Sequence, residues 1–138
     1  MRSGTTFGRV TSHDTALALY ELAPSRPREI HLTVLLAHRP RHRSRLKAVR
    51  IHTTKEPLRS DEVVQRFGVR VTSPARTIAD VSEVGADPSV VIEAIAHALS
   101  TGLVAASELL GSVADRSERV RQLVDRAIKE AGSRAPVR

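Results

Sequence analysis

The sequence predicts one α+β domain, with a small, mainly antiparallel sheet of three to four strands, a short helix before it and three to four helices after it. Three observations carry this prediction. Apolar residues alternate with a period of two between residues 30 and 71, which is typical of strands. From residue 72 onward their spacing becomes helical. The length of 138 residues suits a single domain, and with no cysteine the chain has no disulfides to hold it together.

The first half of the chain contains the expected strands. Ser12, ahead of an Ala- and Leu-rich stretch, predicts an N-cap and a short helix that ends near Leu22. The alternating stretches 30–36 and 48–53 predict two strands. Two further β-prone stretches, 62–66 and 69–71, flank Gly68 and predict a hairpin.

Two residue pairs mark helix starts in the second half. Ser73-Pro74 and Asp87-Pro88 each combine an N-cap with a proline at the first helical position, and Gly102 suits a helix end. A short helical piece is expected over 107–110, and an amphipathic stripe predicts a last helix over 120–131, packed internally or against a second copy. The expected boundaries are a flexible basic arm over 1–11, the domain over 12–131 and a disordered tail over 132–138.

The charge of the chain is unevenly distributed. The net charge is +7, and residues 1–55 hold 11 Lys and Arg against 3 Asp and Glu, a net of +8. The densest basic segment is 39–47, and its candidate anion-binding residues are Arg39, Arg41, His42, Arg43, Arg45 and Lys47. One interpretation is a phosphate-contacting loop that reads no bases. The other is a solvated hairpin loop, and the sequence leaves both open.

Other features of the sequence narrow the function classes. No apolar run is long enough to span a membrane, and the N-terminus has no apolar signal core, so we expect a cytoplasmic protein. The three aromatic residues, Phe7, Tyr20 and Phe67, are too few and too scattered to predict a base-stacking platform. A helix-turn-helix over 88–112 is not expected, because its second piece (105–112) has no Lys or Arg to read a groove.

No catalytic or metal-binding pattern emerges from the sequence. His31 and His52 lie in the middle of two expected strands and could face each other, but Glu29 is the only acidic residue in either strand. We therefore expect no metal and no cofactor. Because no nucleophile pattern or nuclease-like set of carboxylates is present, we expect no enzymatic activity.

A compact polar run follows the hairpin. It contains Thr72, Ser73, Pro74, Arg76, Thr77 and Asp80 at the point where a strand gives way to a helix. The helix N-terminus, with Thr72 and Arg76, would suit an anion. The favoured interpretation is a cap plus an Arg76–Asp80 ion pair that locks the helix to the sheet.

These segments resemble the C-terminal domain of AbiEi-type antitoxins. The resemblance begins with the run 12–22, continues through 30–34 and 49–53, and extends more loosely over 94–110. It is most specific in the run from Gly68 to Asp80, which holds Thr72-Ser73-Pro74-Ala75-Arg76-Thr77.

The resemblance implies an antitoxin from an abortive-infection, type IV toxin–antitoxin pair whose partner is a nucleotidyltransferase-like toxin. Such antitoxins generally carry an N-terminal winged helix that represses their operon. Only about eleven residues precede the first expected helix here, so we expect the winged helix to be lacking and any DNA contact to come from the basic loop and arm. The alternative is a non-specific nucleic-acid-binding module without antitoxin activity.

Overall fold

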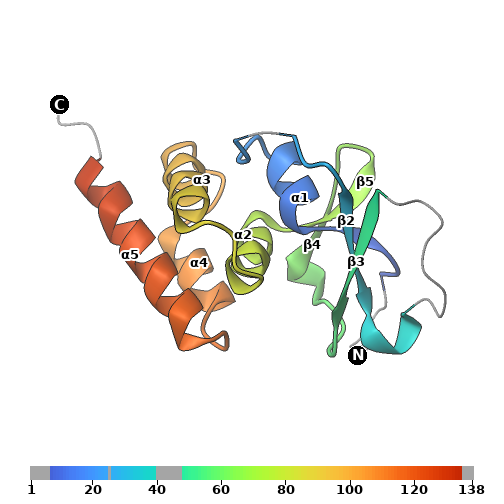
Figure 1. The fold of residues 1–138 in the computed structure, drawn as a ribbon. Helices are drawn as coiled ribbons and strands as arrows, with labels where there is room; N and C mark the ends of the chain where they lie inside the picture. Colours follow the sequence, from blue (N-terminus) through green and yellow to red (C-terminus); the bar gives the residue numbers. More distant parts are fainter. Residues whose placement is uncertain (1–6, 25, 40–47, 135–138) are drawn as a thin grey trace.

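The computed structural model describes residues 7–24, 26–39 and 48–134. A sheet lies at one end of the molecule, with helices α1 (His13–Leu19) and α2 (Pro74–Glu83) against it. Helices α3 (Pro88–Ser100), α4 (Ala106–Ser112) and α5 (Glu118–Arg134) lie on the other side of α2 (Figure 1). The α+β class is therefore confirmed, as are the short helix before the main strands and the helices after them.

The sheet differs from the predicted one. It has five strands in the order β3-β2-β1-β5-β4, and it is mixed. The strands are β1 (Val10–Thr11), β2 (Ile30–Leu35), β3 (Val49–Thr54), β4 (Val63–Arg66) and β5 (Val69–Thr72). The pairs β1–β2 and β4–β5 are antiparallel, whereas β2–β3 and β1–β5 are parallel. The prediction of three to four mainly antiparallel strands was wrong in both number and direction.

The missing strand is the two-residue β1 at the centre of the sheet. Val10 pairs with Thr33 of β2, and Thr11 pairs with both Leu32 and Val71. Val10 is fully buried, so the domain begins before residue 12 and the expected flexible arm cannot include Val10 and Thr11. At the other end, α5 continues to Arg134, beyond the expected boundary at 131.

The parallel pairing of β2 with β3 excludes a hairpin loop between them. Parallel neighbours need a crossover that returns the chain to the same end of the sheet. The crossover begins with a 3-10 turn over Leu36–His38 and includes the basic segment. The expected hairpin geometry of this segment was therefore wrong, whereas its interpretation as a solvated segment stays a prediction.

The local signals in the second half are confirmed. The Ser73 Oγ accepts a hydrogen bond from the backbone N–H of Arg76 at 3.2 Å, and the Asp87 carboxylate accepts one from Ser89 at 2.9 Å. Gly102 takes the left-handed conformation (φ 75°) after α3. A hydrophobic core joins α1, β5 and the four later helices, and it includes Val71, Ile78, Ile95, Leu109, Val120 and Val124. The stripe on α5 therefore packs within the chain.

No helix in the described ranges is long and apolar enough to cross a membrane.

Candidate functional site

The polar run after the hairpin forms a buried connection between the sheet and α2. The hydroxyl groups of Thr72 and Thr77 lie 2.6 Å apart, and the Thr77 hydroxyl also donates to the Thr72 backbone carbonyl. Tyr20, which directly follows α1, donates its phenolic O–H to the same carbonyl at 2.8 Å. Pro74 follows the Ser73 cap at the first position of α2. The strand end, α1 and α2 are thus joined at Thr72.

A chain of charges completes this connection. The Arg76 Nε donates to the Asp80 carboxylate at 2.9 and 3.1 Å, and its terminal nitrogen donates to Glu62 at 3.0 Å. Arg116, from the turn between α4 and α5, donates to Asp80 at 2.7 Å. Asp80 is only 4% exposed. We call Glu62, Arg76, Asp80 and Arg116 the ion lock.

The ion lock agrees with the favoured sequence interpretation and extends it. The predicted Arg76–Asp80 pair is present, whereas Glu62 and Arg116 were missed because they lie 14 and 36 residues from their partners. Burial alone would lower the pKa of Arg76, but the Asp80 and Glu62 carboxylates outweigh burial and raise it. Both guanidinium groups are already held by carboxylates, so the α2 terminus does not offer Arg76 to an external anion.

A stack of three histidine rings lies beside the lock. The rings of His13 and His52 are 3.6 Å apart between centroids and nearly parallel, and His31 lies 5.1 Å from His52. His31 Nδ1 and His52 Nε2 share a hydrogen bond of 2.9 Å, so these two side chains do face each other as the sequence suggested. His13 was missed, because Ser12 and His13 look like an ordinary helix start. We call these three residues the histidine stack.

The backbone positions His13 for this contact. His13 is the first residue of α1 and has a left-handed conformation (φ 52°), which is uncommon outside glycine. Thr33 pairs with His52 in the parallel register, and His31 lies two residues earlier on the same face of β2. The Thr33 hydroxyl donates to the Ser12 Oγ at 2.7 Å, and the Ser12 Oγ lies 2.8 Å from the His13 Nδ1. Ser12 therefore acts as a buried bridge instead of a side-chain cap.

The surroundings favour the neutral form of two of the three rings, those of His13 and His52. Burial lowers the pKa of His13 to about 3, and the neighbouring His52 and His31 rings act in the same direction. Burial and the His31 ring also lower the pKa of His52. The nearest carboxylate to His31 is that of Asp14, at 3.9 Å from Nε2. The packing of the stack thus disfavours the charged forms of His13 and His52.

The chemistry open to these residues is limited. Ser12 is fully buried, so its hydroxyl cannot reach a substrate in this structure. Glu29, the carboxylate considered for a metal, pairs with Arg50 instead. Within the described ranges no group of three or more histidine, aspartate or glutamate side chains is arranged to hold a metal ion.

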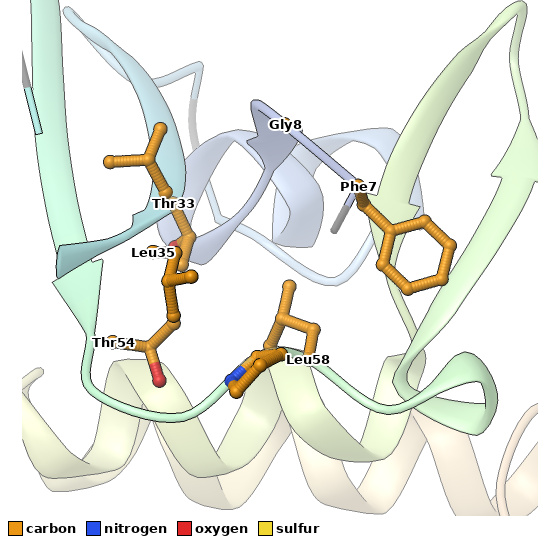
Figure 2. A pocket seen from close by; sticks show the side chains of 8 residues that line it. Phe7, Gly8, Thr33, Leu35, Thr54 and Leu58 are labelled. Atoms are coloured by element: carbon orange, nitrogen blue, oxygen red, sulfur yellow. The ribbon is translucent and has the colours of Figure 1, made fainter. Parts of the chain in front are cut away.

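A pocket beside the sheet is mainly apolar. Figure 2 shows its lining, which comes from the N-terminal segment, β2, the end of β3 and the stretch after it: Phe7, Gly8, Thr33, Val34, Leu35, Thr54, Pro57 and Leu58. Its two hydroxyl groups are already used, since Thr33 donates to Ser12 and Thr54 donates to the carbonyl of Glu56. Neither threonine hydroxyl is therefore free to donate a hydrogen bond to a ligand in this pocket.

Of the candidate residues in the basic segment, the structure describes only the first. Arg39 is exposed at the end of the 3-10 turn. Arg41, His42, Arg43, Arg45 and Lys47 lie outside the described residues. The expected phosphate contacts of this segment stay a prediction.

Comparison with known proteins gives no identification, since no family model matches the chain and no curated protein aligns with it significantly.

The β4–β5 hairpin brings two aromatic residues together. The rings of Tyr20 and Phe67 meet edge to face, with centroids 5.9 Å apart. The Arg66 guanidinium lies 5.3 Å from the Tyr20 centroid and 5.0 Å from that of Phe67. The expectation that the aromatic residues are scattered was therefore wrong for this pair, because residues 47 positions apart in sequence meet where α1 packs beside the hairpin.

Proposed function

We propose that the chain acts by binding, as an antitoxin-like regulatory protein of a type IV toxin–antitoxin pair that counteracts a nucleotidyltransferase-like toxin. The resemblance of the run from Gly68 to Asp80 supports the family assignment. The observation that favours binding over catalysis is that the buried polar groups satisfy one another. In the described part of the chain no buried side-chain nitrogen or oxygen lacks a hydrogen-bond partner.

The two polar clusters have structural tasks under this proposal. The ion lock fixes α2 against the sheet and against the α4–α5 turn, and the histidine stack fixes the start of α1 against β2 and β3. The residues that bind a partner are then expected on the surface of the domain. The basic segment 39–47 contributes anion contacts to that surface.

Growth rescue tests the proposal. The chain is co-expressed with a nucleotidyltransferase-like toxin encoded beside it, in a host that the toxin alone arrests. We expect growth to be restored by the wild-type chain and less well by Asp80→Ala, which destabilises the fold. Continued arrest, with the wild-type protein shown to be folded and abundant, would reject antitoxin activity.

A second candidate function is non-specific nucleic-acid binding without antitoxin activity. The net charge of +8 over residues 1–55 favours it. Replacing Arg41, Arg43 and Arg45 together by Glu should then weaken retention on a DNA or RNA column at moderate salt. Unchanged retention would show that this segment makes no phosphate contacts.

A further inference from the structure

The tip of the β4–β5 hairpin combines strain with exposure of a large aromatic side chain. Phe67 and Gly68 form its two-residue turn, and both have positive φ angles, 57° and 80°. A turn of this kind favours Asn, Asp or Gly at its first position, and a bulky residue there is strained. Phe67 nevertheless occupies this position and is 48% exposed. The contact with Tyr20 covers only part of the ring, and a strained residue whose side chain stays half exposed is a reason to look for a function there.

The two strands on either side of this turn each carry an arginine, Arg66 in β4 and Arg70 in β5. Arg66 and Arg70 are both exposed, and within the described ranges neither guanidinium forms an ion pair with a carboxylate. Arg66 pairs with Val69 and Gln65 pairs with Arg70, so the two arginines lie on opposite faces of the hairpin. A strand of nucleic acid that crosses the tip would therefore meet one arginine on each face of the hairpin, Arg66 on the face that packs against Tyr20 and Arg70 on the other.

We infer that this hairpin tip binds single-stranded nucleic acid, with an unpaired base stacked on Phe67 and the adjacent phosphates held by Arg66 and Arg70. An aromatic ring with neighbouring arginines is the unit that single-strand binders use. A protein partner fits less well. The exposed apolar residues on the hairpin are Phe67 and Val69, an area far below the roughly 800 Å² per partner of a stable protein interface.

This site is separate from the basic segment and does not depend on antitoxin activity. It refines the nucleic-acid-binding alternative by locating a contact in the hairpin instead of residues 39–47. The two proposals are therefore tested independently. A loss of oligonucleotide binding in the hairpin variants would leave the growth-rescue result unchanged. A failure of growth rescue would leave the oligonucleotide-binding result unchanged.

The test measures fluorescence anisotropy of a labelled single-stranded oligouridylate, about twelve nucleotides long, with the full chain. We expect Phe67→Asn to raise Kd at least about fivefold by removing the stacked ring, and Phe67→Tyr to bind nearly as well as wild type. Because Asn suits the turn, Phe67→Asn should stay folded. Leu110→Asn, at an exposed apolar position on α4, is the matched control and should leave Kd unchanged.

The arginines are tested by the salt dependence of the same binding. Arg70→Gln should lower the slope of log K against log salt by about 0.7 for the lost phosphate contact, and Arg126→Gln on α5 should not. The inference is overturned if the wild-type chain does not bind the oligonucleotide. It is also overturned if Phe67→Asn and Leu110→Asn bind equally, or if Phe67→Asn abolishes growth rescue while oligonucleotide binding is unchanged, since the tip would then be a protein contact.

Discussion

Removing the Asp80 carboxylate should cost far more stability than removing an exposed carboxylate in the same helical geometry. Asp80→Ala leaves the Arg76 and Arg116 guanidinium groups without this partner, where their side chains are only 16% and 17% exposed. Breaking a buried pair in this way costs about 3–5 kcal/mol. A domain of this size has a total stability of about 5–15 kcal/mol, so the variant should lose about a fifth of it or more.

The chain supplies a matched control on α5. Arg126 and Glu130 also form an i, i+4 pair, with a distance of 2.8 Å, but their side chains are 67% and 38% exposed. Glu130→Ala should therefore cost only about 0.3–0.5 kcal/mol.

Urea denaturation at neutral pH, followed by far-UV circular dichroism, measures both losses. The double variant Arg76→Ala/Asp80→Ala completes a double-mutant cycle with the two single variants. It should lose less free energy of unfolding than the sum of the single losses, because it no longer buries an unpaired Arg76. If Asp80→Ala lost no more stability than Glu130→Ala, the ion lock would not hold the helices to the sheet.

The remaining predictions concern the histidine stack and the Thr72 junction. The pKa of His13 is about 3 in the folded chain and about 6.5 when unfolded, so the unfolded state binds more protons and stability should fall as pH drops from 6.5 toward 3. His13→Asn, which tolerates the left-handed conformation, should flatten that decline in urea midpoints measured between pH 7 and pH 4; an identical decline would show that other groups cause it. Tyr20→Phe should cost about 0.5–1.5 kcal/mol by removing the hydrogen bond to Thr72, and no loss in urea denaturation would contradict the role of that bond. Burial raises the pKa of Tyr20 to about 12, so absorbance at the phenolate wavelength should rise only in strong alkali, and titration near pH 10 would show an exposed hydroxyl.

The features that the sequence predicted well are local ones. The Ser73 and Asp87 caps, the Gly102 helix end and the hairpin at Gly68 each depend on residues within a few positions of one another. The Arg76–Asp80 pair belongs to the same class, because residues four apart on a helix are neighbours.

The features that sequence reasoning missed depend on distant partners. A strand of two residues is too short to show the alternation of apolar and polar residues, so the sequence did not predict β1. Strand direction is likewise set by pairing and not by composition, which is why the parallel β2–β3 pair was unexpected. The one available hint to the histidine stack was His31 and His52 in neighbouring strands, and only the fold brings His13 onto them.

The central position of β1 has a consequence for the order of folding. Thr11 must find Val71, sixty residues later in the chain, before β2 and β5 can belong to one sheet. Contacts over such separations form slowly, because a long loop must close before any pairing is gained. The helices after residue 87 have nearer partners in the chain. During synthesis β1 therefore stays unpaired on its β5 side until residue 71 has left the ribosome. We expect the formation of the sheet around Val10 and Thr11 to be the slowest step of folding.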